Sequence, residues 1–156
     1  MHFVRKASIL VALGFAFSGA MAGEIVGSTV QSNGARNVSA GISSTARQNI
    51  GLAEGNGKII NSRVTANNLS NTSAGLNSSA TQEVGFARGN GVVQNATVQV
   101  NGATNLAAGL SATAVQKIGG AEGNGKLTNS TVIANNASNI AAGFNSSAEQ
   151  KIGVAR

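Results

Sequence analysis

The sequence predicts an all-β fold: a β-solenoid, or cross-β stack, of four 34-residue repeats, in which each repeat forms a layer of three or four short strands. Three observations predict it: a 34-residue period without insertions or deletions, an alternation of apolar and small residues with period two, and the absence of proline. Loops ordinarily tolerate changes of length, so a rigid period indicates that each residue is in register with its copies. Proline lacks the backbone N–H that a strand ladder needs, so its absence suits continuous strands.

Residues 1–22 are predicted to be a signal peptide rather than part of the fold. Arg5 and Lys6 supply a positive n-region, residues 7–17 supply an apolar h-region, and the A-M-A sequence that ends at Ala22 supplies a cleavage site. The apolar run is short for a membrane span, which needs about 20 residues. We therefore expect cleavage near Ala22, export through the periplasm to the cell surface or the extracellular space, and no membrane span in the mature chain.

Residues 23–156 are predicted to form a single repeat domain. Aromatic residues make up 3% of the chain and charged residues 10%, so the large side chains of a conventional globular core are scarce. Stacked layers need fewer of them, because each layer buries its faces against its neighbours. The four repeats are expected at about 24–58, 59–92, 93–126 and 127–156.

Strands are predicted from the first repeat, where apolar, small and amide residues fall on every second position. Period two places side chains on one face of extended strands, whereas a helical-hairpin repeat of similar length would show a period near 3.6. Gly41 and Gly51 are expected to divide this run into shorter strands. The side chains expected on one face are those of Val38, Ala40, Ile42, Ser44, Ala46, Gln48, Ile50 and Leu52.

Two sets of turns are predicted in the repeats, because Asn and Gly tolerate positive φ. One set consists of Asn-Gly or Asn-Asn pairs that begin at Asn33, Asn67, Asn101 and Asn135. The other set is a Gly-Asn-Gly turn that leads from one repeat to the next. Its members are Gly55, Asn56 and Gly57, then Gly89, Asn90 and Gly91, and then Gly123, Asn124 and Gly125.

Amide residues at fixed phases of the repeat predict hydrogen-bonded ladders along the stack. A buried Gln is costly unless its amide is hydrogen-bonded, and in a stack the same Gln recurs about 4.8 Å above and below. Ordinary turn and surface amides are the alternative, which we favour for Asn56 and its copies. The predicted ladder residues are Gln48, Gln82, Gln116 and Gln150; Asn37, Asn71, Asn105 and Asn139; and Asn33, Asn67, Asn101 and Asn135.

The few charged residues argue against a nucleic-acid partner. Without Arg5 and Lys6, nine basic residues remain against five acidic ones, a net charge of +4, and they are scattered along the chain. Alternating charges attract weakly between layers, so an alternating phase is expected to favour the correct register more than to add stability. One phase alternates in sign through Glu54, Arg88, Glu122 and Arg156.

Residues 139–145 (NIAAGFN) and 105–111 (NLAAGLS) resemble the N-x-A-A-G-x-N repeat core of the Fap-type functional amyloid proteins. Gln150 and Ile152 are similar to the Gln and apolar positions that follow that core. The order of Ser, Gln, Gly and Asn in residues 43–56 also resembles curli subunit repeats, although the spacing differs. The chain has one Gln where the Fap pattern has two, and it lacks the C-x-x-C ending and the long linkers of that family.

The resemblance implies a secreted bacterial structural protein that self-assembles into extracellular amyloid fibres of a biofilm matrix. It also implies three kinds of partner: identical chains in an axial homopolymer, related fibre subunits, and an outer-membrane export pore. A major subunit, a minor or nucleating subunit, and a separate lineage with the same architecture all stay open as interpretations.

Polymerisation is also expected on physical grounds. A solenoid that stays monomeric usually carries an atypical capping repeat, yet the last copy here is as regular as the others. Both ends are therefore expected to expose strand edges to which another copy can add head to tail. The rival hypotheses are a monomeric β-solenoid that binds a ligand such as ice or a glycan on a flat face, and a surface-anchored adhesin.

Enzymatic activity is not expected. From residue 23 onward the chain contains no His, Cys, Tyr or Asp, which removes most of the usual acid–base, nucleophilic and metal-ligating groups. The five Glu residues lie at scattered phases of the repeat. We therefore predict no catalytic site, no metal site and no cofactor.

Overall fold

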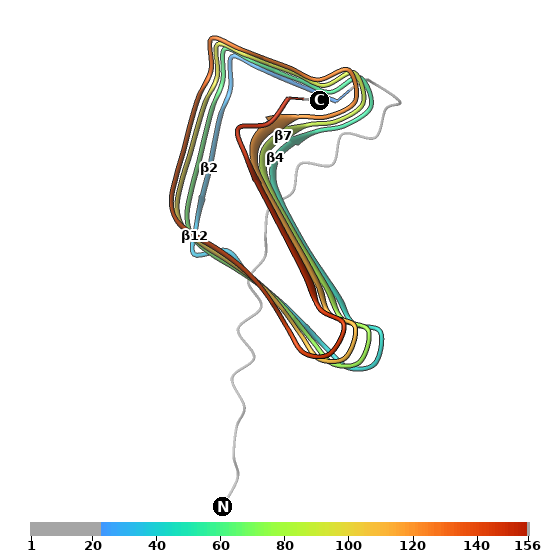
Figure 1. The fold of residues 1–156 in the computed structure, drawn as a ribbon. Helices are drawn as coiled ribbons and strands as arrows, with labels where there is room; N and C mark the ends of the chain where they lie inside the picture. Colours follow the sequence, from blue (N-terminus) through green and yellow to red (C-terminus); the bar gives the residue numbers. More distant parts are fainter. Residues whose placement is uncertain (1–22, 156) are drawn as a thin grey trace, which may run out of the picture.

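The computed structural model describes residues 23–155, which form strands and turns with no helix (Figure 1). The predicted signal peptide and Arg156 lie outside the described residues. The strands are β1 (Glu24–Val26), β2 (Thr29–Asn33), β3 (Arg36–Ala40), β4 (Thr45–Ala53), β5 (Lys58–Ile60), β6 (Arg63–Ala74), β7 (Ser79–Ala87), β8 (Val92–Gln94), β9 (Thr97–Ala108), β10 (Thr113–Ala121), β11 (Lys126–Thr128), β12 (Thr131–Ala142) and β13 (Ser147–Ile152).

Each repeat forms one layer of a β-solenoid, and the strands of successive layers pair in parallel. Gln48 pairs with Gln82 and Gln82 pairs with Gln116, so the register between layers equals one 34-residue repeat. Layer 1 contains the four strands β1 to β4, and each later layer contains three. The predicted stack of four repeats with three or four strands each is confirmed, and Figure 1 shows the four layers overlying one another.

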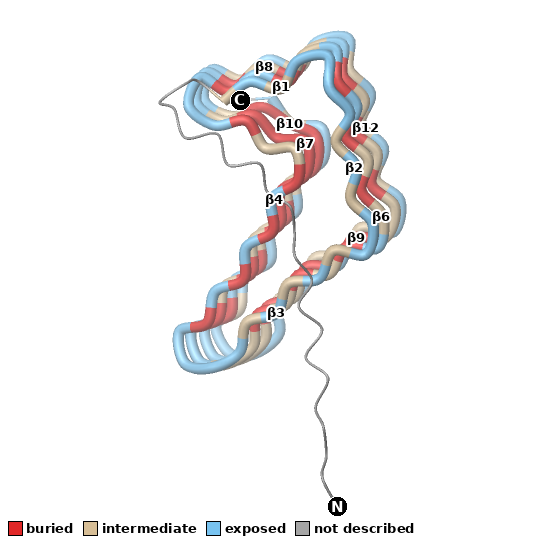
Figure 2. The backbone as a smooth tube through the Cα atoms, turned by 180° about the vertical axis from the view of Figure 1, so that it is seen from behind, coloured by how far each residue is buried: buried red, intermediate tan, exposed pale blue. Residues whose placement is uncertain are grey.

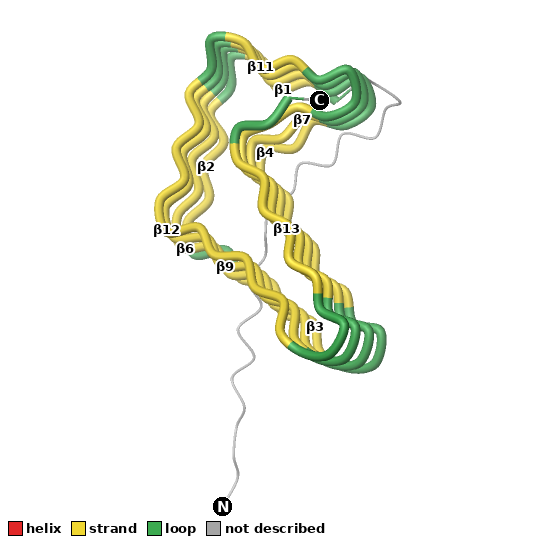
Figure 3. Tube along the Cα trace, viewed as in Figure 1, coloured by secondary structure: helices red, strands yellow, loops and turns green. Residues whose placement is uncertain are grey.

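The strands of the four layers build three sheets that run along the solenoid axis (Figure 3). The first sheet has the order β1-β5-β8-β11, and the third has the order β4-β7-β10-β13. In the second sheet β2 and β3 both pair with β6, which is followed by β9 and β12. The main cluster of buried side chains draws Val64 and Val98 from the second sheet and Val84 and Ile118 from the third. These two sheets therefore enclose a core that repeats from layer to layer.

Residues with positive φ bend the chain at the corners of each layer. Gly34 has a φ of 66° and Asn68, at the same phase, has a φ of 53°, so the predicted Asn-Gly and Asn-Asn turns are corners of the solenoid. Gly55, with a φ of 76°, lies in the loop from β4 to β5, where the chain passes to the next layer. Gly51 does not divide two strands as predicted. It bends β4 at a φ of 61° while the strand continues to Ala53.

The prediction that every second residue from 38 to 52 shares one face is wrong for the first half of that run and for Leu52, since Ala53 rather than Leu52 is buried beyond Gly51. Val38 is 54% exposed and Ile42 is 79% exposed. The chain turns at residues 41–43, and Ser43 has a φ of 56°. This turn changes which alternate positions face inward, so Ser39 rather than Ala40 lies on the inner side of β3. Figure 2 shows half-buried residues alternating with exposed ones along β3, and buried residues alternating with exposed ones along the first part of β4.

Close packing between layers predicts that the glycine of this turn tolerates no side chain. Gly109 has a φ of 133°, and a Cβ atom there would lie 1.8 Å from the carbonyl oxygen of Gly75. We expect Gly109→Asn to lower the free energy of unfolding by more than about 3 kcal/mol, because backbone strain and a steric clash act together. Urea or thermal unfolding followed by far-ultraviolet circular dichroism measures the change.

Gly102→Asn in the same layer is the matched control. Gly102 has a φ of 69°, its nearest contact for a Cβ atom is 3.3 Å away, and Asn68 already occupies the same phase. The free energy of unfolding of this variant is expected to lie within about 0.5 kcal/mol of the wild-type value, as is usual for surface substitutions. Equal unfolding midpoints for the two variants would contradict the role assigned to the packed turn.

Candidate functional site: amide ladders and open edges

A ladder of four Gln side chains runs through the interior of the stack. The Nε2 group of Gln82 donates to the Oε1 atom of Gln48 at 2.6 Å. The same bond joins Gln116 to Gln82 at 2.7 Å and Gln150 to Gln116 at 2.6 Å. Gln82 and Gln116 are fully buried, because they hold inward positions of the two middle strands of the third sheet. The structure thus brings together the four Gln residues that the sequence singles out.

A second interior ladder is formed by the Asn residues of the second sheet. The Nδ2 group of Asn37 donates to the Oδ1 atom of Asn71 at 3.0 Å. Asn71 donates in turn to Asn105 at 2.8 Å, and Asn105 donates to Asn139 at 2.8 Å. Asn71 and Asn105 are fully buried. Each amide in the middle layers therefore has one partner above and one below, which removes most of the cost of burying it.

The interior Asn residues also tie the second sheet to the third. The Nδ2 group of Asn71 donates to the carbonyl oxygens of Ala46 at 3.1 Å and Thr81 at 2.9 Å, on two successive strands of the third sheet. Beside it, the hydroxyl groups of Ser44 and Ser73 lie 2.9 Å apart across the same interface. Sequence reasoning missed these contacts between sheets, because the repeat period does not show which strands face one another.

A third ladder lies at the corner of the solenoid between the two halves of the second sheet. Asn67 donates to Asn33 at 2.7 Å, Asn101 donates to Asn67 at 2.9 Å, and Asn135 donates to Asn101 at 2.9 Å. These side chains are exposed or half-buried. The same Asn residues therefore take part both in the corner and in a hydrogen-bonded ladder.

The Gly-Asn-Gly turns carry exposed ladders that the sequence interpretation left as ordinary surface amides. Asn90 donates to Asn56 at 3.1 Å, and Asn124 donates to Asn90 at 3.1 Å. Asn95 also donates to Asn61 at 3.2 Å, a pair that sequence reasoning missed although its 34-residue spacing was visible. The flanking glycines lie in the loops from β4 to β5, β7 to β8 and β10 to β11; they are Gly55, Gly57, Gly89, Gly91, Gly123 and Gly125.

The two interior ladders point in opposite directions along the axis. In the Gln ladder each layer donates to the preceding layer, and in the Asn ladder each layer donates to the following one. At the layer 4 end the Gln ladder finishes on the accepting Oε1 atom of Gln150, and at the layer 1 end it starts from the Nε2 group of Gln48. The Asn ladder starts from the accepting Oδ1 atom of Asn37 and finishes at the Nδ2 group of Asn139. The two ends of the described stack are therefore complementary.

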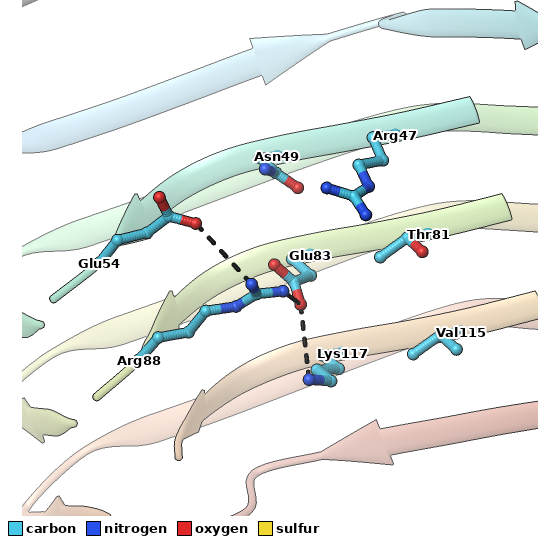
Figure 4. Close-up of a pocket in the computed structure, with 8 residues that line it drawn as sticks. All are labelled: Arg47, Asn49, Glu54, Thr81, Glu83, Arg88, Val115 and Lys117. Atoms are coloured by element: carbon cyan, nitrogen blue, oxygen red, sulfur yellow. Dashed lines mark hydrogen bonds and ion pairs between the residues drawn. The ribbon is translucent and has the colours of Figure 1, made fainter. Parts of the chain in front are cut away.

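A network of charged side chains lies in a recess on the outer side of the third sheet (Figure 4). The Glu83 side chain is 1% exposed; it accepts a hydrogen bond from Arg88 and lies 3.6 Å from the Nζ atom of Lys117. Lys117 also contacts Glu122 at 2.9 Å, and Arg88 lies 3.8 Å from Glu54. Three members of the predicted alternating phase thus belong to a larger network that includes Glu83 and Lys117, which lie five residues before Arg88 and Glu122.

These ion pairs shift two pKa values. The hydrogen bond to Glu83 raises the pKa of Arg88, and the hydrogen bond from Lys117 lowers the pKa of Glu122. Because the pKa of Glu122 is lowered in the folded state, its contribution to stability is present above the unfolded pKa and is lost as the pH falls through the folded pKa. Both side chains are partly exposed to solvent, so the contribution is small and the network chiefly favours one register.

The stack presents hydrogen-bonding groups in a repeating pattern. Within residues 23–155, no group of three or more His, Cys, Asp or Glu residues is placed to hold a metal ion. In that same part of the chain, no helix is long and apolar enough to cross a membrane. Comparison with known proteins finds no matching family model, no matching curated protein and no matching solved structure.

The interior Gln ladder predicts a pH-dependent defect for Gln82→Glu. The carboxylate would be buried between Gln48 and Gln116 and would lack the donor that Gln48 now accepts from. Burial raises the pKa of such a carboxyl group above its unfolded value of about 4.3. At neutral pH we therefore expect Gln82→Glu to lower the free energy of unfolding by about 3 kcal/mol. Since the folded pKa is raised, stability is retained below the unfolded pKa and falls as the pH rises through the folded pKa.

Asn90→Asp in the exposed ladder is the matched control, because it makes the same amide-to-carboxyl change in the same layer. Because solvent screens an exposed carboxylate, we expect Asn90→Asp to lower the free energy of unfolding by less than about 1 kcal/mol, with little dependence on pH above 5. Unfolding midpoints measured from pH 3 to pH 8 test both variants. A Gln82→Glu profile that runs parallel to that of Asn90→Asp would contradict a buried, hydrogen-bonded ladder.

Proposed function

We propose that this chain is a structural subunit that polymerises head to tail along the solenoid axis into a cross-β fibre. The observation that carries the proposal is the pair of open, mutually complementary sheet edges at layers 1 and 4. Each edge offers backbone groups, an amide ladder and charges in the register that a further layer requires. An exposed edge of this kind is a template for another chain.

The layer 4 edge offers unpaired backbone groups. The N–H of Ser147 donates to the carbonyl oxygen of Ala112 in layer 3. Because alternate residues of a strand direct their backbone groups to opposite neighbours, those of Ala148 and Gln150 point away from layer 3. Among residues 23–155, no strand pairs with β13 on that side. A further strand can therefore add there in parallel.

The layer 1 edge offers the complementary unpaired backbone groups. The carbonyl oxygen of Ser44 accepts from the N–H of Ser79 in layer 2, so the backbone groups of Thr45 and Arg47 point away from layer 2. Within the described part of the chain, β4 has a partner strand on its layer 2 side alone. Layer 4 of one copy and layer 1 of the next therefore pair as two successive layers of one molecule do.

Side chains support the same head-to-tail contact. In that contact the Nε2 group of Gln48 in one copy faces the accepting Oε1 atom of Gln150 in another, which continues the Gln ladder. The alternating charge phase also continues, because the sequence places Arg156 one layer before Glu54 of the next copy. Each molecule would then add four layers, or roughly 19 Å of fibre, at about 4.8 Å per layer.

The cellular setting of the proposal follows from the resemblance to functional amyloid repeats. We place the fibre outside a bacterial cell, in the biofilm matrix, after signal-peptide cleavage and export through an outer-membrane pore. Related fibre subunits are candidate partners, and this chain suits either the main fibre or its nucleus.

The proposal is tested with the chain from Gly23 to Arg156. Fibre diffraction is expected to show a meridional reflection at about 4.7–4.8 Å, and thioflavin T fluorescence is expected to grow during incubation. A soluble, β-rich monomer at high concentration would contradict the proposal and would favour a monomeric binding module or an adhesin.

The variant Ala148→Pro tests the layer 4 edge without disturbing the pairing within the molecule. Proline removes an N–H that points away from layer 3, so the bonds between layers 3 and 4 are kept while the outer edge is blocked. Such a molecule can add to a fibre through its layer 1 and then stop further growth. We expect substoichiometric Ala148→Pro to stop elongation at the fibre end that exposes layer 4, while the end that exposes layer 1 continues to grow; time-lapse fluorescence microscopy of single fibres measures both ends. Ala148→Ser is the control, and inhibition by both variants alike would contradict the mechanism.

A further inference from the structure

A row of large apolar side chains runs along the outside of the stack, at the turn that joins the second sheet to the third. Its members are Ile42, Leu76, Leu110 and Phe144, which are 79%, 45%, 51% and 71% exposed. One such side chain per layer forms a ridge parallel to the solenoid axis. Exposed apolar surface that recurs in register marks a contact surface rather than chance exposure.

A row of small residues lies beside this ridge on the outer face of β3, β6, β9 and β12, and we call it the alanine trough because larger residues flank it on both sides. Its floor is a row of alanines, Ala40, Ala74, Ala108 and Ala142, followed in every layer by a glycine that has no side chain. The far side of the trough is a row of larger residues, Val38, Thr72, Leu106 and Ile140. Val38 is 54% exposed and Ile140 is 45% exposed, and the turn places all three rows on the outside.

This outer surface carries no charge. Residues 37–44, 71–78, 105–112 and 139–146 contain no Asp, Glu, Lys or Arg, although such residues occur elsewhere in every repeat. Charged side chains on exposed strands are what ordinarily keep β-proteins from associating. The surface therefore lacks the usual protection against contact with a flat, apolar partner.

We propose that two solenoid stacks pair laterally through this surface, the ridge of one stack lying in the alanine trough of the other. The inference rests on the proposed axial fibre and adds a second, independent contact between copies of the same chain. Since each copy carries both a ridge and a trough, one two-fold contact uses both at once, as in an isologous interface. Small residues opposite large ones allow the dry interdigitation found between paired sheets.

The available area makes this pairing depend on fibre length. Four layers at about 4.8 Å and a width of four residues at about 3.3 Å give roughly 250 Å² per molecule. A stable interface buries about 800 Å² per partner, so a single pair of molecules falls well short. Roughly three molecules stacked on each side reach that area. Lateral pairing therefore follows axial growth and does not occur between monomers.

The test removes the apolar ridge in alternate layers and leaves the backbone hydrogen-bonding groups of both axial edges unchanged. The double variant Ile42→Lys, Leu110→Lys places charges in layers 1 and 3. The control Gln31→Lys, Gln99→Lys places the same charges in the same layers on the outer side of β2 and β9. Fibres of the chain from Gly23 to Arg156 are measured by electron microscopy and by mass per unit length.

We expect two molecules per roughly 19 Å of fibre for the wild type and the control, and one molecule for the ridge variant, at about 4.8 Å per layer. Single stacks from the wild type, or paired stacks from the ridge variant, would overturn the pairing alone. No fibres from the wild type would overturn the axial proposal, and the pairing with it.

A second variant keeps the inference testable if the ridge variant fails to fold. Ala108→Leu fills the trough without adding charge, so it is expected to yield single stacks that still lengthen and bind thioflavin T. Paired stacks of Ala108→Leu with the mass per length of the wild type would contradict the ridge-in-trough contact.

Discussion

The register of the parallel ladder is the constraint on which the rest of this structure depends. Every residue of a middle layer lies between its own copies 34 residues away, at the close spacing of paired strands. That placement makes it possible to bury Gln82 and Asn71, because each amide meets an identical amide on either side. A shift by one residue would turn these amides outward and bring apolar side chains against water.

The same constraint explains the unusual composition. Layers that are one strand thick have little interior to fill, so Ala, Ser, Val and Ile are sufficient and aromatic residues are rare. Glycine is required where carbonyl groups of adjacent layers come close, as at Gly109 and Gly75. The buried carboxylate of Glu83 is stabilised by ion pairs with Arg88 of its own layer and Lys117 of the next layer. Within residues 23–155, each layer repeats the pairing of the layer before it.

The repeat made the architecture and the ladder positions predictable, because a strict period and amide-rich phases report directly on stacking. The period did not report which side of a strand faces inward. In the sequence, Val38, Ile42 and Gln48 all fall on alternate positions of one run. In the structure, the turn at Ser43, with a φ of 56°, places Val38 and Ile42 on the outside of the layer and Gln48 on the inside. Contacts between facing sheets, such as Asn71 with Ala46, were hidden for the same reason. They depend on how the layer folds back on itself, which a one-dimensional pattern does not contain.

The central claim is that layer 4 of one molecule continues into layer 1 of the next in the same register, and cross-linking tests it most directly. The chain has no Cys, so an Arg47→Cys and a Glu149→Cys variant can be mixed in fibres; both positions share one phase and are exposed. The account predicts a disulfide between different molecules, because Cα atoms about 4.8 Å apart suit that bond. Ser147→Cys, displaced by two residues to a separation of roughly 8 Å, should not form one with Arg47→Cys. Equal cross-linking at both positions, or none at the first, would contradict the account.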